Sequence, residues 1–365
     1  MKQLTIILTS NEPWGEVWYS KQHYANELSE LGHKVFFLNP PTKWEFSNLF
    51  HLSVEKVAIS NTLVILDQRN NFPLRIVPRF FSWLNDFFNC WKLRRVVKTE
   101  ELIFWQFDPF RFARIFFFRT KRIYHVVDPY FHLPLDKILA AKADLIPIVS
   151  AYYESYYPRE KTFMVPHGVS QSESVIEESR LNLIREEVGE GYLLFAGTFN
   201  VDVDYDLLLK LAELPYQLLL VGPDYVQDGY LDRLGELLNV TYLGSRSAGD
   251  LKYFVKLAKA CIVPYRKERT GNVHRTPLKI INYLAHHKPI VSTINYELVE
   301  FDELYIFVRE EPAAFLDEVN KLMALSDTQA IKPNELLNNY LESIAYRKLI
   351  SSIVDKLFKQ DSKTS

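Results

Sequence analysis

The most informative segment of the chain reads Arg275-Thr276-Pro277-Leu278-Lys279-Ile280-Ile281-Asn282-Tyr283-Leu284-Ala285. It predicts a helix that begins near residue 276, because Thr276 is a capping residue and Pro277 suits a first helical turn. The spacing of Arg275, Lys279 and Asn282 puts all three on one face of that helix. A second face is apolar and can pack on a sheet; it consists of Leu278, Ile281, Leu284 and Ala285.

A helix that starts in this way presents free backbone N–H groups in its first turn, and these attract anions. Arg275 and Lys279 would add a cation on each side of that turn, and Asn282 a polar group two turns in. The segment therefore fits a nucleotide diphosphate. A surface helix with ordinary solvated charges fits the same pattern, so the segment alone leaves both interpretations open.

Short apolar runs that end in turn residues alternate with amphipathic runs along most of the chain. With 365 residues, 48% of them hydrophobic, we expect two domains, each with its own core. The alternation predicts parallel sheets with helical crossovers, so the fold class is α/β with doubly wound domains. We expect strands at residues 4–9, 34–38, 63–66, 102–106, 123–127, 145–149, 162–165, 192–196, 217–221, 240–243, 261–264 and 289–293.

A polar stretch that follows Gly168 predicts the boundary between the two domains. We expect an N-terminal domain over residues 1–170 and a second domain over residues 171–338. Residues 339–365 read as a tail of one or two amphipathic helices that packs back on the first domain.

Composition excludes several classes of protein. The net charge of −2 gives no reason to expect a nucleic-acid partner. The two cysteines, Cys90 and Cys261, lie far apart in apolar surroundings, which argues against a disulfide framework or a zinc site. No run reaches 18 uninterrupted apolar residues, so we expect no transmembrane helix and a cytoplasmic protein.

Residues 276–293 resemble a segment written P-x-K-x-x-E-Y-L-A-x-G-K-P-V-V-S in nucleotide-sugar transferases of the glycosyltransferase family 4, or group 1, type. Residues 165–169, Val-Pro-His-Gly-Val, resemble that family's interdomain P-N/H-G-V. The resemblance implies the GT-B fold, in which two Rossmann-like domains face a central cleft. It also implies a nucleotide-diphosphate sugar as donor and a saccharide or lipid-linked saccharide as acceptor.

Three residues depart from the family's pattern. Asn282 stands where the family usually has a Glu that binds the ribose hydroxyls, so it could still bind ribose but without the charge. His274 aligns with the family's other Glu. His287 stands where a helix-ending Gly is usual, and a left-handed turn would cost free energy there. These departures leave open an altered donor, a weaker enzyme or an inactive relative.

The resemblance places the donor site in the second domain. Arg275 and Lys279 would stabilise the leaving diphosphate as negative charge builds on it, without a metal. We therefore expect no cofactor and no metal site, with the nucleotide sugar as co-substrate. Asp202 and Asp204 have the spacing of a metal-binding Asp-x-Asp, but we expect them to cap the following helix. The expected donor-binding residues are Gly197, Thr198, Arg275, Thr276, Lys279 and Asn282.

The acceptor is expected on the first domain. Asp128 follows a predicted strand, and open α/β sheets bind ligands at the carboxyl ends of their strands. It could act as the base on the acceptor hydroxyl or orient that hydroxyl; a cap for the segment after Pro129 is the alternative. Glu12, Trp14 and Gly15 lie in the first loop, also at a carboxyl end, and are expected to bind the acceptor. A loop packed by its own aromatic side chains is the alternative there.

Residues 72–98 and 111–122 are rich in Phe, Trp, Arg and Lys. A basic, aromatic helix can lie on an anionic membrane surface, which would suit a lipid-linked acceptor at the inner membrane surface. The alternative is a domain helix whose apolar face lies in the core.

Together these features predict a glycosyltransferase, which the resemblance implies to be retaining, metal-independent and active in surface polysaccharide biosynthesis. Two other functions stay open. A sugar-nucleotide epimerase of the same fold would convert free nucleotide sugar with no acceptor present. A non-catalytic relative would bind a nucleotide or a partner without turnover.

Overall fold

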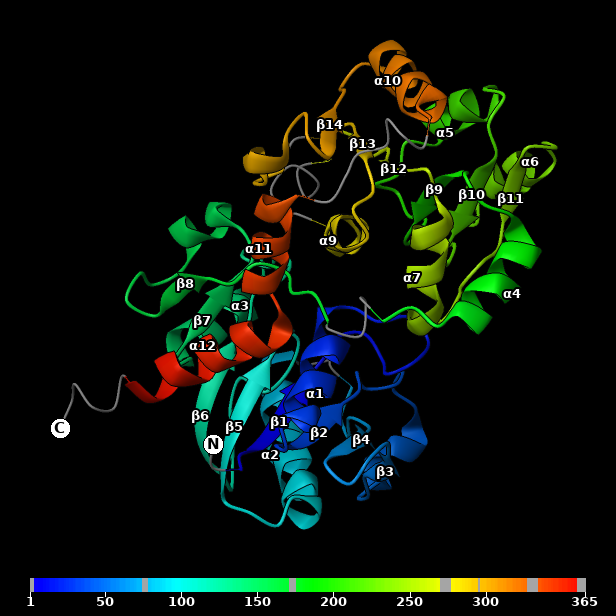
Figure 1. Cartoon of the computed structure of the whole chain (residues 1–365). Coiled ribbons are helices and arrows are strands. Elements are labelled where there is room, and N and C mark those ends of the chain that lie inside the picture. Colours follow the sequence, from blue (N-terminus) through cyan, green and yellow to red (C-terminus); the bar gives the residue numbers. More distant parts are fainter. Residues whose placement is uncertain are drawn as a thin grey trace. The chain divides into compact units, whose positions relative to one another are not determined.

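The computed structural model describes residues 3–73, 78–170, 175–269, 277–294, 296–326 and 334–359. The chain divides into two compact units, each built around its own sheet (Figure 1). Unit 1 comprises Met1–Pro166 and Tyr346–Ser365, and unit 2 comprises His167–Ala345.

The main sheet of unit 1 has the strand order β3-β4-β2-β1-β5-β6, in which β3 runs antiparallel to β4 and the other neighbours are parallel. The pair β7-β8 joins its edge through single bridges from Ile123 to Leu145 and from Val126 to Ile148. The elements of unit 1 are β1 (Thr5–Thr9), α1 (Ser20–Glu30), β2 (Lys34–Leu38), η1 (Phe46–Phe50), β3 (Glu55–Ala58), β4 (Leu63–Asp67), α2 (Pro78–Val96), β5 (Glu101–Gln106), β6 (Arg119–Tyr124), α3 (Pro134–Lys142), β7 (Ile146–Ile148), η2 (Ala151–Tyr156), β8 (Thr162–Met164) and α12 (Tyr346–Lys359).

Alternate residues of these strands enter two separate cores, because successive side chains of a strand point to opposite faces. Ile6 and Trp105 pack with residues of α1, α3 and α12 on one face. Ile7 and Phe104 pack with Cys90 and other residues of α2 on the other face. The basic, aromatic segment after residue 72 thus includes a domain helix, one face of which covers the sheet.

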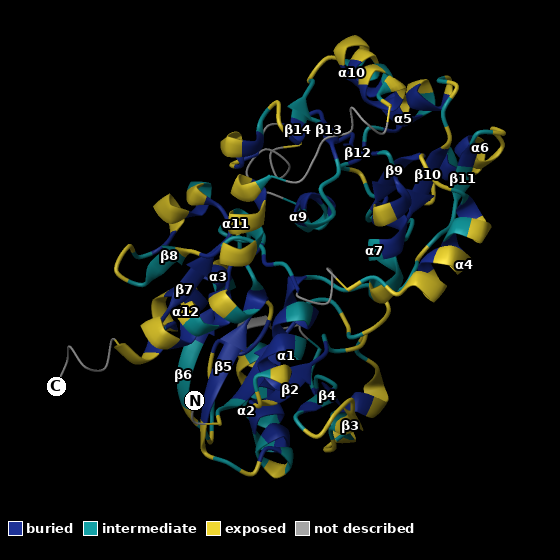
Figure 2. Cartoon of the chain, in the orientation of Figure 1, coloured by how far each residue is buried: buried dark blue, intermediate teal, exposed yellow. Residues whose placement is uncertain are grey.

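Unit 2 repeats the plan with six parallel strands in the order β11-β10-β9-β12-β13-β14. Its central strands β9, β10, β12 and β13 are buried along their whole length, as a parallel sheet covered on both faces requires (Figure 2). The elements are α4 (Glu178–Val188), β9 (Leu193–Ala196), α5 (Tyr205–Ala212), β10 (Leu218–Val221), α6 (Tyr230–Gly235), β11 (Val240–Tyr242), α7 (Ala248–Leu257), β12 (Ala260–Val263), α9 (Leu278–Ala285), β13 (Ile290–Ser292), η4 (Val299–Phe301), β14 (Ile306–Val308), α10 (Pro312–Ala324) and α11 (Glu335–Ser343).

Both sheets reverse their strand order beside their first strand, which confirms the prediction of doubly wound domains. In unit 1 the chain adds β2 on one side of β1 and β5 on the other; in unit 2 it adds β10 on one side of β9 and β12 on the other. At such a reversal the loops at the carboxyl ends diverge and leave room for a ligand. A ligand site is therefore expected at the carboxyl ends of β1 and its neighbours in unit 1 and of β9 and its neighbours in unit 2.

One strand lies earlier than the sequence indicated. The strand expected at residues 123–127 is β6, which covers Arg119–Tyr124, and Val126 makes only the single bridge to Ile148. The first four residues of β6, Arg-Thr-Lys-Arg, are too polar to read as a buried strand, because only the end of β6 is buried. Sheet pairing with β5 along its whole length overrides that local preference.

The limits of the tail also differ from those expected. The first domain was expected to end at residue 170 and the tail to begin at residue 339, whereas unit 2 spans His167–Ala345. Leu337 and Ile344 enter the core of unit 2, so α11 belongs there. Ile350 and Ile353 of α12 enter the core of unit 1, and Arg347 pairs with Glu27 of α1 at 3.1 Å.

The helix α9 begins later than the sequence indicated. Leu278 is its first residue, and Pro277 occupies the N-cap position with an extended backbone and no side-chain cap. Thr276, the expected cap, lies outside the described residues. The backbone N–H of a residue at this position makes no hydrogen bond within the helix, so a proline, which lacks that N–H, costs no helical hydrogen bond there.

The end of α9 has the form of a Schellman motif, in which two backbone bonds close the last turn. Lys288 N–H donates to the Tyr283 carbonyl at 3.1 Å, and His287 N–H donates to the Leu284 carbonyl at 2.9 Å. His287 has a φ of 54°, which is the left-handed conformation expected for the position that Gly occupies in the family.

Among the described residues, no helix is both long enough and apolar enough to span a bilayer.

The positive φ of His287 predicts that His287→Gly will be more stable than His287→Ala. Both variants lose the imidazole, but only Ala keeps the steric cost of a left-handed residue, which is roughly 1–2 kcal/mol. Urea denaturation followed by circular dichroism measures the difference. Equal unfolding midpoints for the two variants would contradict the assignment of strain to this turn.

Candidate functional site

The strand reversal of unit 2 brings together a lysine and two aromatic rings. Lys279 comes from the first turn of α9, and its Nζ lies 4.0 Å from the ring centroid of Phe195 in β9. The same Nζ lies 4.7 Å from the ring centroid of Tyr265, which follows β12. The ammonium group is therefore placed where β9 and β12 part, at the carboxyl ends where a ligand site is expected.

Two glycines make room for this arrangement. Gly197 follows β9 with a φ of 154°, and a Cβ there would collide with the Lys279 ammonium. Gly222 follows β10 with a φ of 140°, and a Cβ there would collide with the carbonyl oxygen of Gly197. Gly197 N–H also donates to the Val221 carbonyl at 2.8 Å. The Lys279 ammonium thus packs directly against the backbone at the end of β9.

Two buried hydroxyls fix the neighbours of Lys279. The Tyr283 hydroxyl accepts a hydrogen bond from Ala196 N–H at 2.8 Å and donates to the Ala196 carbonyl at 3.2 Å, which ties α9 to the end of β9. The Thr293 hydroxyl accepts from Tyr265 N–H at 2.9 Å and donates to the Tyr265 carbonyl at 2.6 Å. Because Tyr283 and Thr293 are buried, water does not compete for these bonds.

Some of the expected donor-site residues can be placed and others cannot. Gly197 and Lys279 are in contact range, and Thr198 and Asn282 are half-buried beside them in the chain. Arg275 and Thr276 lie outside the described residues, as does His274.

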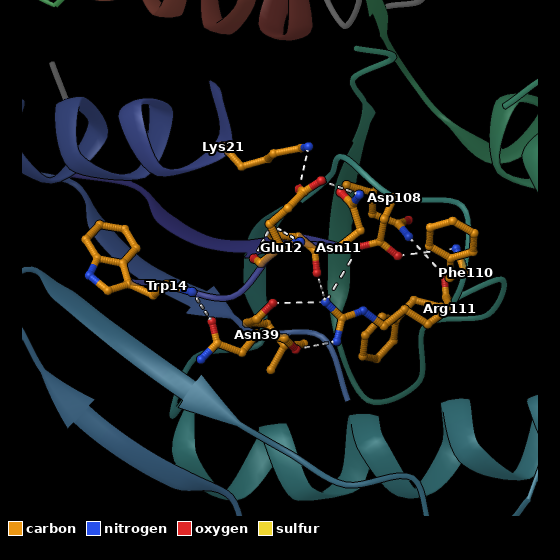
Figure 3. Close-up of polar contacts among 12 residues, drawn as sticks. Asn11, Glu12, Trp14, Lys21, Asn39, Asp108, Phe110 and Arg111 are labelled. Carbon is orange, nitrogen blue, oxygen red and sulfur yellow. Dashed lines mark hydrogen bonds and ion pairs between the residues drawn. The ribbon is translucent and has the colours of Figure 1, made fainter. Parts of the chain in front are cut away.

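The strand reversal of unit 1 gathers charged side chains from three segments (Figure 3). The Glu12 carboxylate, in the loop after β1, lies 2.6 Å from Nζ of Lys21 in α1. The same Nζ lies 4.0 Å from the carboxylate of Asp128. The Lys21 side chain is only 3% exposed, whereas those of Glu12 and Asp128 are 25% and 27% exposed. Two partly accessible carboxylates therefore flank one buried ammonium.

A network of neutral groups connects these carboxylates. Asn11 Nδ2 donates to Glu12 Oε1 at 2.6 Å and to the Tyr130 hydroxyl at 3.3 Å, and that hydroxyl donates to Asp128 Oδ2 at 3.4 Å. Burial raises the pKa of Glu12, which the charge of Lys21 opposes. Burial and the nearby Asp128 carboxylate raise the pKa of Tyr130, so its hydroxyl stays protonated at neutral pH.

Arg111 holds the strand ends beneath this network (Figure 3). Its guanidinium is buried and donates to the carbonyl of Asn39 at 2.6 Å, of Ser10 at 2.7 Å and of Leu38 at 2.9 Å. It also lies 3.6 Å from the Asp108 carboxylate. One side chain therefore joins the ends of β1 and β2 to the loop after β5, and the fixed fork of a guanidinium suits that task.

Trp14 and Gly15 adopt the arrangement of a loop packed by its own aromatic side chains. The indole of Trp14 lies 5.1 Å from the rings of both Trp18 and Phe37, measured between centroids. The Gly15 carbonyl accepts a hydrogen bond from the Trp18 indole at 3.1 Å. Trp14 N–H donates to Asn39 Oδ1 at 2.8 Å, which fixes the loop to the end of β2.

Asp128 does not cap a helix, since α3 begins at Pro134 with Leu133 at its N-cap. Asp204 caps α5 as expected, because its Oδ1 accepts a hydrogen bond from Leu207 N–H at 3.0 Å. Asp202 is not a cap; it pairs with Arg269 at 3.2 Å. The described ranges contain no group of three or more His, Cys, Asp or Glu side chains placed to hold a metal ion.

Sequence reasoning missed Phe195, Tyr265, Lys21, Arg111 and Tyr130. Polar residues that come soon after predicted strands would have identified Arg111, since the Phe-Asp-Pro-Phe-Arg run directly follows β5. The sequence does not identify Lys21 in this way, because Lys21 lies on α1 and does not follow a strand. It is close to Glu12 and Asp128 only in the folded structure.

Residues 191–325 match the family model described as Glycosyl transferases group 1. The match includes Gly197, Lys279 and Asn282 and runs from just before β9 to just after α10. This part of the chain is therefore similar to group 1 glycosyltransferases. No curated protein sequence matches the chain.

Solved structures with the GT-B fold align over nearly the whole length of this chain. They include sucrose-phosphate synthase from Thermosynechococcus elongatus, with a TM-score of 0.71 and 15% identity over 100% of both chains. A glycosyltransferase from Rickettsia africae aligns with a TM-score of 0.69 and 14% identity, over 98% of this chain and 99% of that one. The Anabaena protein HepE, in complex with UDP and glucose, has a TM-score of 0.67 and 13% identity over 98% of this chain and 100% of its own.

The two glycine contacts predict different costs for two similar substitutions. Both Gly197→Ala and Gly222→Ala place a Cβ at positive φ, which costs roughly 1–3 kcal/mol. Gly222→Ala will lower the free energy of unfolding further, because its Cβ meets the rigid Gly197 carbonyl, whereas that of Gly197→Ala meets the movable end of Lys279. Urea denaturation measures both, and an equal loss would argue against the backbone contact.

The burial of Lys21 predicts a pH-dependent cost for Lys21→Met. At pH 8 the variant leaves Glu12 and Asp128 without their shared cation and should lose roughly 1–3 kcal/mol. The pKa of Glu12 is higher in the folded state than in the unfolded state. At a pH between these two pKa values the protein takes up a proton when it folds, so the free energy of unfolding falls as the pH rises through this range. Removing Lys21 raises the folded-state pKa of Glu12 further, so this pH range extends upward. The free energy of unfolding lost by Lys21→Met should therefore be smaller at pH 5 than at pH 8.

Thermal unfolding at both pH values, with the exposed Lys43→Met as control, checks the dependence on Lys21. A penalty for Lys21→Met that is the same at pH 5 and pH 8 would show that Lys21 does not neutralise these carboxylates.

Proposed function

We propose that this protein is a glycosyltransferase and binds a nucleotide-diphosphate sugar, most simply a UDP-sugar, at the strand reversal of unit 2. The observation that carries the proposal is the Lys279 ammonium held against the backbone of Gly197, at the first turn of α9. A cation, a helix N-terminus and close-approach glycines form a typical diphosphate site. The UDP in the similar Anabaena protein supports the choice of nucleotide.

Lys279 would act on the bond that breaks. As the bond between the sugar and the diphosphate lengthens, negative charge grows on the leaving phosphate oxygen. A fixed ammonium and the first N–H groups of α9 would stabilise that charge without reorganising. The rings of Phe195 and Tyr265 already hold the ammonium in place, so little side-chain entropy is lost on binding. We propose on this basis that the diphosphate needs no metal ion. Arg275 and Thr276 complete the proposed donor site by resemblance alone.

We propose that the acceptor binds at the strand reversal of unit 1 and that Asp128 orients or deprotonates its hydroxyl. Asp128 and Glu12 lie beside Lys21 yet are partly exposed, which suits hydrogen bonds to sugar hydroxyls. Trp14 is already packed in its loop, so we assign the first contacts to Glu12 and Asp128.

Three finer features of the proposal rest on the family resemblance. We propose transfer with retention of anomeric configuration, to a saccharide or lipid-linked saccharide, in surface polysaccharide synthesis. We place the reaction in the cytoplasm at the inner surface of the membrane. Proton NMR of the product's anomeric signal will decide the stereochemical course.

The site itself is tested by binding UDP, GDP, ADP, CMP and dTDP to Lys279→Met and to the unchanged protein. Met keeps the apolar stem beside Phe195 and removes the charge. Isothermal titration should show at least about tenfold weaker binding of the preferred nucleotide, since a hydrogen bond to a charged group contributes about 1.5–3 kcal/mol. Lys210→Met, an exposed position on α5, is the matched control and should bind as the unchanged protein does.

Equal affinity of Lys279→Met and the unchanged protein would refute the phosphate assignment. If the preferred nucleotide sugar is converted to its epimer with no acceptor present, the epimerase alternative replaces the transferase. If it binds but is neither hydrolysed nor transferred, the chain is a binding relative, as Asn282 in place of Glu would permit.

A further inference from the structure

The helix α2 buries polar residues beside Cys90 and Leu93 and exposes aromatic ones. Its polar residues Asn85, Asp86, Asn89 and Lys92 are 3%, 2%, 1% and 1% exposed. On its other side Phe80 and Trp83 are 55% and 36% exposed. Helices that cover a sheet normally bury their apolar stripe and expose their polar one.

The buried polar residues of α2 are held by specific hydrogen-bond partners, so the fold itself keeps them buried. Asn85 bonds both the N–H and the carbonyl of Phe72 at 2.9 Å. Asp86 accepts from the N–H groups of Phe112 and Arg114 at 2.8 Å and 3.0 Å. Lys92 donates to the Arg69 carbonyl at 2.6 Å. These bonds satisfy the buried groups and fix the loops before and after α2 against it.

The outward side chains form a continuous row of rings, the aromatic ridge, made of Phe80, Trp83, Phe87, Phe116 and Phe117. Neighbouring ring centroids along it lie 6.4 Å, 6.2 Å, 5.4 Å and 6.2 Å apart. Phe117 is 46% exposed and has a φ of 66°, which is a costly conformation for an aromatic residue. The backbone is therefore strained where it presents a phenyl ring to solvent.

The charge around the aromatic ridge is mainly positive, although the exposed Glu100 and Glu101 lie nearby and Glu100 pairs with Arg94 at 3.0 Å. Residues 78–98 and 110–122 hold ten Arg and Lys residues and a single carboxylate, that of Asp86, which is buried. Trp83 and Phe87 share one face of α2, and the Arg95 guanidinium lies 4.7 Å from the ring centroid of Trp91 on the same helix. Arg114 and Arg119 flank Phe116 and Phe117 in the chain. Arg95, Arg114 and Arg119 are exposed. The whole chain has a net charge of −2, so this concentration of cations is local.

We propose that the aromatic ridge docks on an anionic lipid bilayer, with its rings at the headgroup boundary and its cations on the lipid phosphates. Exposed Trp and Phe beside an excess of Arg and Lys are complementary to such a surface. The inference deepens the proposed function, since it rests on an acceptor that is linked to lipid. It adds the residues that would hold the enzyme at the membrane.

The test is co-sedimentation of the full chain with vesicles of phosphatidylcholine alone or with 30% phosphatidylglycerol. We expect binding to the anionic vesicles that weakens with salt. Phe80→Ser/Trp83→Ser/Phe117→Ser should weaken it at least about tenfold through lost apolar contact, and Arg95→Glu/Arg114→Glu by a similar factor through lost charge. Tyr225→Ser/Leu238→Ser, which alters exposed apolar residues of unit 2, should bind as the unchanged protein does.

A second readout does not depend on a large substitution. Brominated lipids should quench tryptophan fluorescence of the unchanged protein, and the quenched fraction should fall in Trp83→Phe, which keeps an aromatic ring. Absence of binding to anionic vesicles, or unchanged binding by both multiple variants, would overturn the proposal. Capture of a protein partner by the ridge in place of vesicles would overturn it too.

Nucleotide binding separates this proposal from the proposed function. If the protein binds UDP but does not bind anionic vesicles, the proposed membrane-binding surface is refuted and the proposed donor site is not. Vesicle binding through the ridge in a protein that binds no nucleotide would refute the donor site and support the surface.

Discussion

The reversal of strand order beside the first strand of each sheet is the constraint on which the rest of the structure depends. At β1 and at β9 the chain turns from building the sheet on one side to building it on the other. The loops that follow the two neighbouring strands then run in opposite directions, and side chains from other segments of the same unit fill the space between them. Lys279 fills it in unit 2, and Lys21 and Arg111 fill it in unit 1.

The two units use that space differently. In unit 2 the Lys279 ammonium lies against the rings of Phe195 and Tyr265 and the backbone of Gly197. In unit 1 the cations are bonded to carboxylates and carbonyls, so their charge is largely neutralised. The proposed function assigns the first arrangement to an anionic ligand and the second to a neutral, hydroxylated one.

The sequence predicted the fold better than the site. Buried parallel strands such as β9 and β10 are short apolar runs closed by glycine, so they are readable locally. The polar start of β6 and the buried polar residues of α2 were not readable, because pairing with β5 and hydrogen bonds to distant loops override local pattern. Likewise Asp128 and Lys279 could be chosen because they adjoin strand ends or a helix start. Lys21 and Tyr265 could not, since only the tertiary fold brings them to their partners.

The position of α12 has a consequence for how the protein is made. Unit 2 is continuous in sequence, whereas unit 1 needs Tyr346, Ile350 and Ile353, which follow unit 2 in the chain, to complete its core. As the chain leaves the ribosome, unit 2 can finish folding while one face of the unit 1 sheet, already packed by α1 and α3, still lacks α12. The segment made first is thus completed last, and during synthesis its exposed apolar face is the part that needs protection from aggregation.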